Sequence, residues 1–577
     1  MTTRFLPPMM IMPKSTAFFA LLFVVVLIPA ARAIVPRYDG VLNPALLATQ
    51  DEINSGTVSL QTLFYRGMHF YSNRFTTNDG LGEAPDGPRR RVQLLAQNTR
   101  NPFLRFNGLD AQACLECHSA LGFKRYGDLS MAREPGTVGA GAGISASVMI
   151  FENPNDLDHG IVRNPPHTFG LGYIQRLSDE MTAELLAERD AALAEAEATG
   201  ENVHLELEAK GVRFGSIVVL PNRAMDRAGI EGLSIDMVVR PFQFKGVASS
   251  LRNFIAGALN FHFSVQPKEL MDRAFIPDDN PNKTLPNDKH DEVMEGEVTA
   301  IATFLAAMRP PQQDTTGLDV AAVNRGRALM DSTGCTSCHI PSLRIDDPLV
   351  TIADPRFLRD FEYYEEGAKK ADFISIRRAK VNNAPPAMTA AEEFSDYLAP
   401  VVQYEWKKNP SRFAQVAKSG KRPLPAHPPG FTFDLNDPNL PDEARPRLPH
   451  NPDGSIDVPL FSDLRRHKMG DYLADTVPQR TEMQSILAPA DEFVTRPLWG
   501  VNDTAPWLHD GRATTLREAI IMHDGPGSEA ASSIALFNQL SQEDQDSIIE
   551  FLRSLRLPGM GHAPEPGVLH REAFVTQ

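Results

Sequence analysis

The sequence predicts a helical protein of two domains separated by long loops. A five-residue pattern of cysteines and histidine occurs twice, at residues 114–118 and 335–339, which indicates two similar units far apart in the chain. Several segments carry apolar residues at the spacing of an amphipathic helix. The 46 prolines and 39 glycines indicate much loop, and 577 residues suffice for more than one hydrophobic core.

Residues 1–33 have the pattern of a secretory signal peptide. Positive charge from Arg4 and Lys14 precedes an apolar run from Ala17 to Ala30, and residues 31–33 (ARA) have the small-x-small form of a cleavage site. The apolar run is short for a membrane span, which needs about 20 residues. We therefore expect a periplasmic or secreted protein without stable membrane insertion. An uncleaved N-terminal anchor is the alternative.

The formal net charge of −16 limits the classes of partner. An acidic protein repels nucleic acid and anionic membrane surfaces, so we expect neither as a main partner. A small basic redox protein would suit the charge. The alternative is that the charge only keeps the protein in solution.

All four cysteines of the chain belong to the repeated pattern, as Cys114, Cys117 and His118, and as Cys335, Cys338 and His339. C-x-x-C-H is the attachment motif of c-type haem. Cysteines three residues apart project from one face of a helical turn, so both can bond the vinyl groups of one porphyrin. The following histidine then lies under the ring, where its imidazole can ligate the iron. We expect two covalently bound c-type haems.

Three other uses of the cysteines compete with this interpretation. An exported protein could form two disulfides, a C-x-x-C pair can act as a redox dithiol, and both pairs together could hold a zinc ion. None of the three explains why a histidine follows each pair. We therefore expect neither a disulfide nor a free thiol.

Helix signals divide the chain into two domains. An apolar pattern predicts a helix over residues 291–308, and the prolines after Arg309 end it, because proline cannot continue a helix. We therefore predict a signal peptide over 1–33, an N-terminal cytochrome c-like haem domain over 34–312, and a C-terminal cytochrome c domain over 313–577.

The C-terminal domain is expected to pair its first and last helices around a long insertion. Residues 324–330 form the first helix, before the second motif, and residues 541–555 form the last. Ser541 is an N-cap candidate, and the stripe of apolar residues after it predicts an amphipathic helix. Within the insertion, residues 420–460 are expected to form a surface loop. In the N-terminal domain, the Ala/Glu-rich helix over 178–199 is expected to be a solvated surface.

Four segments spread over the mature chain resemble the bacterial di-haem oxidoreductases. These are peroxidase-like proteins, once called thiol oxidoreductases and distantly related to di-haem cytochrome c peroxidases. The segments are RNPP with FGLG (163–172), RPFQFKG with SLR (240–252), FSDL with HKMG (461–470), and PLWG with LHDGRATTL (497–516).

The resemblance implies a mostly α-helical fold of two cytochrome c-like haem domains with long loops and small β elements. It further implies that the C-terminal haem receives electrons and that the N-terminal haem reacts with peroxide or a similar small oxidant. The electron donor would be a small redox protein. The resemblance transfers a scaffold more safely than a reaction, because one fold hosts many chemistries.

His118 and His339 are the expected proximal iron ligands. For the second position on the C-terminal haem we favour His523, because the related peroxidases place a distal methionine at the same distance after their His-Asp-Gly. Met522 and Met469 are its rivals. His509, His467 and Arg512 are candidates to bind haem propionates, because buried carboxylates need charged donors.

The distal side of the N-terminal haem has three candidates, His159, His167 and His262. His159 stands roughly where related peroxidases carry a removable distal histidine. His262 stands where the family often has an acid followed by methionine. It could still move a proton between peroxide oxygens, because imidazole titrates near neutral pH. We therefore name His262 and His159 as the catalytic candidates, while packing in the core is the plainer role for His262.

A second departure from the family is Phe244, which stands where relatives often carry a tryptophan that could relay electrons. Trp499 and Trp507 remain as relays, although core packing is the better interpretation for each. The leading hypothesis is a peroxidase-like di-haem oxidoreductase. The alternatives are a non-enzymatic di-haem electron carrier, a di-haem oxygenase and a protein-modifying di-haem oxidase.

Overall fold

The structure is a computed structural model that describes residues 42, 47–76, 79–81, 112–118, 144–145, 161–263, 265, 267–269, 292–355, 430–475, 478–480 and 487–558. These residues belong to one compact unit, Gly40–Gln577. The predicted signal peptide and His159 lie outside the described residues.

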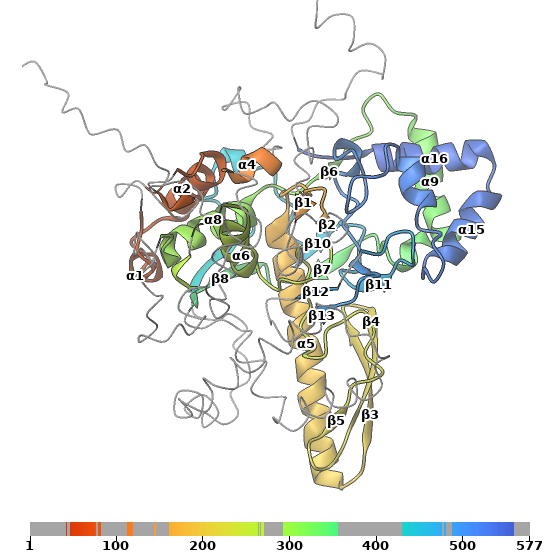
Figure 1. Ribbon diagram of the computed structural model, residues 1–577, viewed down its shortest axis with the longest axis horizontal. Helices are drawn as coiled ribbons and strands as arrows, with labels where there is room; N and C mark the ends of the chain where they lie inside the picture. Colours follow the sequence, from red (N-terminus) through yellow and green to blue (C-terminus); the bar gives the residue numbers. More distant parts are fainter. Residues whose placement is uncertain are drawn as a thin grey trace, which may run out of the picture. The chain divides into compact units, whose positions relative to one another are not determined.

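Helices before the first motif pack on a helix far along the chain (Figure 1). Helix α2, Leu60–Ser72, begins at the N-cap Ser59, and it lies against α8, Glu295–Ala307. Every residue of α8 from Gly296 onward is buried, as expected for a helix that is apolar on all sides. Gly67 permits the close approach, because a methyl group there would overlap the carbonyl group of Ala300. The short α1, Gln50–Asn54, and α6, Leu251–Phe263, also contact α8.

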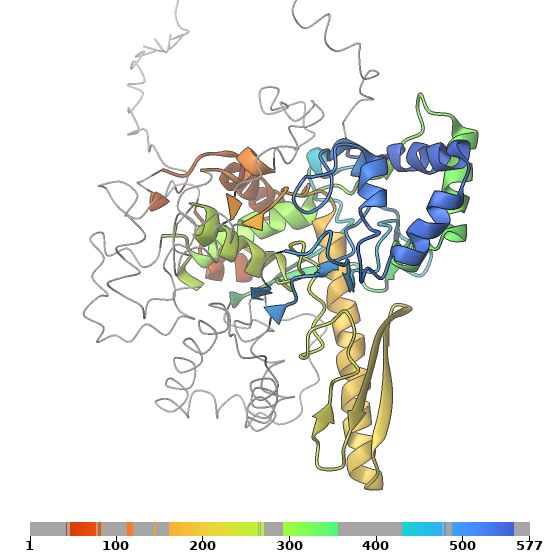
Figure 2. The same cartoon turned by 45° about the vertical axis from the view of Figure 1, so that its right-hand side comes forward.

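Helix α5, Leu171–Thr199, carries a β-hairpin along one side (Figure 2). The hairpin pairs β3, Val203–Ala209, with β4, Val212–Val219, and β5, Met225–Asp226, pairs with β4. The expectation of a solvated helix over 178–199 was wrong, since Met181, Leu185 and other residues of α5 are buried. The hairpin covers apolar positions that look isolated in the local sequence.

The helices around the second motif form their own core. Helix α9, Val320–Ser332, packs against α16, Gln542–Arg553, which confirms the predicted pairing of these two segments. Ser541 caps α16 by accepting a hydrogen bond from the backbone N–H of Asp544 at 3.1 Å, also as predicted. The core includes buried side chains from both helices and from α14, Leu516–Ile521, and α15, Ala531–Gln539.

Small antiparallel sheets tie distant segments together. Each of the following pairs has two strands: β7, Leu343–Ile345, with β10, Ile456–Val458; β8, Leu349–Ala353, with β9, Gly430–Asp434; β11, Arg466–Lys468, with β14, Glu492–Val494; β6, Gln312–Gln313, with β15, Leu555–Arg556; β12, Gln479–Arg480, with β13, Leu487–Ala488; and β1, Ile144–Ser145, with β2, Ile161–Val162. The expected surface loop over 420–460 was therefore wrong where the chain is described, because β9 and β10 lie within it.

The described residues thus combine helices with small sheets, so the fold is mixed rather than mostly helical. Residues from 42 to 308 share a hydrophobic core with residues from 343 to 464, whereas α9, α14, α15 and α16 pack in a second cluster. The domain boundary between residues 312 and 313 stays a prediction. Within the described ranges, no helix combines the length and apolar character needed to cross a membrane.

Candidate functional site

The two C-x-x-C-H motifs each form a single helical turn closed by the same backbone hydrogen bond. Residues Cys114–Cys117 form the one-turn helix α4, and Cys335–Ser337 form a 3-10 turn, η6. In each motif the histidine N–H donates a hydrogen bond to the carbonyl oxygen of the first cysteine, at 2.8 Å for His118 and 3.0 Å for His339. The chain therefore presents two cysteines and a following histidine in the order that haem attachment needs.

The rings of the two motif histidines are oriented in the same way. The Nδ1 atom of His118 lies 2.6 Å from the carbonyl oxygen of Pro166, and the Nδ1 atom of His339 lies 3.0 Å from that of Phe461. A carbonyl oxygen only accepts, so Nδ1 carries the proton in both rings and Nε2 keeps its lone pair for a metal. Burial lowers the pKa of each ring to about 4, so both are neutral at pH 7.

The cysteines do not resemble a disulfide, dithiol or zinc site. No disulfide joins any of the four, which all belong to the described residues. Burial raises the pKa of the Cys114 thiol to about 12, whereas a redox dithiol needs a lowered thiol pKa. Among the described residues, the sulfur atoms of the two motifs do not gather into one metal-sized group. These observations support neither a disulfide, nor a zinc site that joins the two motifs, nor a dithiol at Cys114.

His523 faces the second motif with the same tautomer. It follows α14, which starts at a capping box of Thr515 and Glu518. Its Nδ1 atom donates to the carbonyl oxygen of Ala519 at 2.7 Å, so Nε2 keeps its lone pair. His523 also lowers the pKa of His339 electrostatically, which places the two imidazoles near one another. Of its rivals, Met522 is the residue that ends α14, and Met469 pairs through its backbone with Ser528.

His262 lies near the first motif. It belongs to the last turn of α6, it is half-buried, and it lowers the pKa of His118 electrostatically. His167 is different, because its Nε2 atom lies 3.1 Å from the carbonyl oxygen of Trp499 and its Nδ1 atom accepts from the N–H of Phe169 at 3.2 Å. With both nitrogens engaged, His167 has no lone pair for iron. His167 also lies beside the first motif, since Pro166 next to it binds His118, but its engaged nitrogens leave His262 as the better candidate of the two.

His509 belongs to a buried charge network. Its Nε2 atom lies 3.5 Å from a carboxylate oxygen of Asp475, which also contacts Arg163 at 2.6 Å and Lys245 at 3.4 Å. Burial disfavours the charge of Asp475, but hydrogen bonds from His509 and Arg163 hold its pKa well below the usual value. Arg512 is exposed and ion-paired with Asp510. His509 and Arg512, two of the three candidates to bind a haem propionate, therefore already have carboxylate partners.

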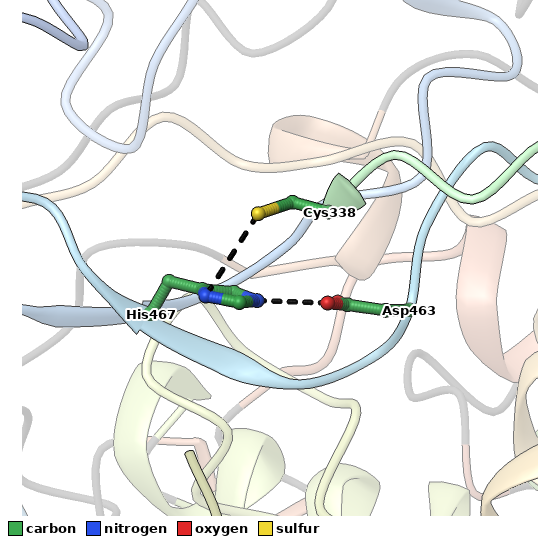
Figure 3. A group of neighbouring side chains, drawn as sticks. All are labelled: Cys338, Asp463 and His467. Atoms are coloured by element: carbon green, nitrogen blue, oxygen red, sulfur yellow. Dashed lines mark hydrogen bonds and ion pairs between the residues drawn. The ribbon is translucent and has the colours of Figure 1, made fainter. Parts of the chain in front are cut away.

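His467 lies beside Cys338 and Asp463 (Figure 3). Its Nδ1 atom is 3.8 Å from the sulfur of Cys338, and its Nε2 atom is 2.7 Å from Asp463. Nδ1 also lies 2.7 Å from a carboxylate oxygen of Glu529. Although burial opposes charge, the bond to Asp463 raises the pKa of His467, to about 11. A doubly protonated ring cannot ligate a metal, so this group is a hydrogen-bond network at the edge of the second motif.

The aromatic relay candidates occupy two environments. Trp499 is almost fully buried, with an indole nitrogen that lacks a hydrogen-bond partner in the described structure. Trp507 donates from its indole nitrogen to the carbonyl oxygen of Val501 at 2.8 Å, as a packed core residue does. The centroid of the Phe244 ring lies 5.3 Å from the guanidinium of Arg496 and 6.2 Å from the centroid of the His509 imidazole.

Arg496 was missed by sequence reasoning. It lowers the pKa of both His118 and His167 electrostatically, so its positive charge lies beside the first motif. Arg496 directly precedes the PLWG segment, which resembles the family. That position was the signal in the sequence that could have indicated its role.

These donors fit two haems. Each motif offers two cysteines on one turn, a histidine with its Nε2 atom available, and a second histidine close to the first. That set matches a covalently attached, histidine-ligated haem better than any other group considered.

Residues 455–555 match the model of a protein family described as "Di-haem oxidoreductase, putative peroxidase". The match includes Phe461, Arg496, His509 and His523, but it covers neither C-x-x-C-H motif. No curated protein and no solved structure matches the chain. The family resemblance predicted from the sequence is confirmed.

Proposed function

Because residues 455–555 match the di-haem oxidoreductase family, we propose that the protein is a periplasmic c-type cytochrome that reduces peroxide or a similar small oxidant. The observation that carries the proposal is the repeated geometry of the motifs. In both, the Nδ1 atom of the histidine is fixed by a backbone carbonyl group, and a second histidine lies near it. The two haems would be attached through Cys114 and Cys117, and through Cys335 and Cys338, in two cytochrome c-like domains.

When bound, the haems would supply the redox chemistry, held at the C-terminal motif for electron entry and at the N-terminal motif for reduction of the oxidant. For hydrogen peroxide, two electrons and two protons break the O–O bond and yield two water molecules. The protein must therefore hold the irons, admit the oxidant at one of them, and move protons there.

The second motif is suited to electron entry. His339 and His523 each keep the Nε2 lone pair, because each Nδ1 atom donates to a backbone carbonyl group. Both imidazoles would hold the C-terminal haem, which would then serve electron transfer rather than substrate binding. His467 remains beside this site as a charged hydrogen-bond donor to Asp463 and Glu529.

The first motif is suited to reaction with the oxidant. His118 supplies the proximal ligand, and His262 provides an imidazole close to it. In this proposal His262 takes the proton from one peroxide oxygen and delivers it to the other, which makes that oxygen a better leaving group. His159 is the other catalytic candidate by sequence.

The location and the donor are proposed from charge and from the N-terminus. Residues 1–33 would direct export, and attachment of c-type haem is completed outside the cytoplasm. A net charge of −16 favours a small basic redox protein as the electron donor, because opposite charges speed encounter.

The test is to record optical and low-temperature paramagnetic resonance spectra of the holoprotein, oxidised and half-reduced, with and without peroxide. We expect one low-spin haem that ignores peroxide and one haem whose high-spin signal changes when peroxide is added. Two low-spin haems that never open would overturn the enzymatic proposal.

That opposite outcome corresponds to a second function, a di-haem electron carrier. The observation in its favour is the closeness of His262 to His118, which would also suit a sixth ligand. A His262→Ala variant separates the two. In an electron carrier it converts the N-terminal haem from low spin to high spin, whereas in the peroxidase it leaves the resting spectrum unchanged and slows peroxide reduction.

A further inference from the structure

Arg496 is half-buried and has no anionic partner among the described residues. It comes two residues after β14, and its guanidinium lies over the ring of Phe244 at 5.3 Å. Within the described part of the chain, no carboxylate and no carbonyl group binds it. Burial alone lowers the pKa of its guanidinium, to about 10, and no carboxylate acts in the opposite direction.

Other largely buried arginines have partners of one of two kinds. Arg163 and Arg240 each pair with an aspartate at 2.6 Å. Arg447 instead donates to backbone carbonyl groups, including that of Ala307 at 2.7 Å. A buried guanidinium without either solution is costly, because its lost hydration is not replaced. Arg496 is half-buried and has neither kind of partner among the described residues, so its guanidinium is available to bind an anion.

The position of Arg496 indicates which anion that is. Three residues after it, the carbonyl oxygen of Trp499 binds His167 at 3.1 Å, and Pro166, next to His167, binds His118 at 2.6 Å. Arg496 therefore lies in the segment beside the motif that would hold the N-terminal haem. A haem carries two propionate carboxylates, and a planar guanidinium is well matched to a carboxylate.

The other candidates for this role are already engaged. His509 contacts Asp475, Arg512 pairs with Asp510, and His467 lies between Asp463 and Glu529. Arg496 is the cation beside the first motif that lacks such a partner among the described residues. We propose that Arg496 binds a propionate of the haem attached at Cys114 and Cys117, an inference that rests on the proposed function.

A propionate pair of this kind sets the properties of its haem. The positive charge offsets the charge of the carboxylate and favours the reduced, less positive iron. Removing the guanidinium should therefore make the N-terminal haem harder to reduce and leave its propionate open to protonation. Phe244 restricts access of water to one face of the guanidinium and so strengthens the interaction.

The test compares Arg496→Gln and Arg496→Lys with the control Arg327→Gln. Arg327 also lies over an aromatic ring beside a motif, at 5.3 Å from Phe461, but it is paired with Asp331 at 3.2 Å. Haem content is measured first by the mass of the intact protein. The readouts are a redox titration of each haem and the propionate-bending bands in the resonance Raman spectrum.

We expect Arg496→Gln to lower the reduction equilibrium constant of the N-terminal haem about tenfold, or ~59 mV for one electron. Its propionate band should shift, Arg496→Lys should recover part of both effects, and Arg327→Gln should change neither. If an Arg496→Gln protein with both haems bound keeps the wild-type reduction potential and the wild-type propionate band, the inference about Arg496 is overturned. That result would leave the proposed function intact. Absence of haem from the wild-type protein would instead overturn the proposed function.

A small free carboxylate could bind Arg496 in the same way as a haem propionate. Acetate is therefore added to the wild-type protein and to Arg496→Gln. Saturable binding of acetate that requires Arg496, together with an unshifted propionate band, would assign the site to a substrate-sized anion and contradict the propionate. The propionate assignment predicts that acetate has no effect on either protein.

Discussion

The imidazole of His523 is held by its own helical turn, because its Nδ1 atom donates a hydrogen bond to the carbonyl oxygen of Ala519 at 2.7 Å. His339 is held in the same tautomer by the carbonyl oxygen of Phe461. Two imidazoles prepared in this way, with electrostatic interaction between them, are suited to bind one iron from opposite sides.

Replacement of His523 tests this pairing. His523→Met should keep the C-terminal haem low-spin and raise its reduction potential, because a thioether favours ferrous iron relative to imidazole. His523→Ala should leave that haem high-spin. Both are checked by redox titration and paramagnetic resonance. Spectra identical to wild type in both variants would show that another residue, such as Met469 or Met522, is the ligand.

His262 should be needed for peroxide reduction. Loss of a positioned proton carrier costs about 10²- to 10⁴-fold in rate, so His262→Gln should slow kcat/KM for peroxide within that range. The rate is measured by stopped-flow absorbance over a range of pH. His204→Gln is the control, because its side chain is 60% exposed and bonded only to Glu206. A rate for His262→Gln equal to that of the control would contradict the catalytic role.

Asp475 should stabilise the fold through its buried charge. Asp475→Asn leaves Arg163 and Lys245 without their carboxylate, and breaking such a pair typically costs about 3–5 kcal/mol. Chemical denaturation measures the loss. Glu197→Gln is the control and should change little, because Glu197 and its partner Arg223 are both exposed.

The same carboxylate predicts a pH dependence. The folded pKa of Asp475 lies below its unfolded value of about 3.9, so its contribution is fully present above that pH. The contribution is lost as the pH falls toward the folded pKa. The wild-type Tm should therefore fall more steeply below about pH 4 than the Tm of Asp475→Asn. Parallel curves would contradict this assignment.

Close packing of α9 on α16 depends on Gly326. A methyl group at this position would overlap the carbonyl group of Ser547, so Gly326→Ala should destabilise the protein by about 1–3 kcal/mol. Gly257 in α6 has open space at the corresponding point, and Gly257→Ala should be neutral or stabilising. Thermal unfolding of both variants compares them directly. Equal melting temperatures would show that the helices do not pack as described.

Local signals predicted the parts of the fold that depend on nearby residues. The prolines after Arg309 end α8, and Ser541 caps α16, because both effects act within one helical turn. The packing of α5 could not be predicted, since the hairpin that covers it is formed by later residues. The strand β9 was taken for a loop because its partner β8 lies about 80 residues earlier in the chain.

The candidate site divides in the same way. The C-x-x-C-H turns follow from residue spacing and were predicted. The engagement of His167 with the carbonyl oxygen of Trp499 and the isolation of Arg496 arise from contacts between distant segments. Such contacts leave no periodic pattern in the sequence, so the structure was needed to find them.

The most direct measurement is the mass of proteolytic peptides from the purified holoprotein. We expect the peptide with Cys114 and Cys117 and the peptide with Cys335 and Cys338 each to carry one covalently bound haem. Peptides with unmodified thiols, or with a metal in place of haem, would contradict the account at both motifs.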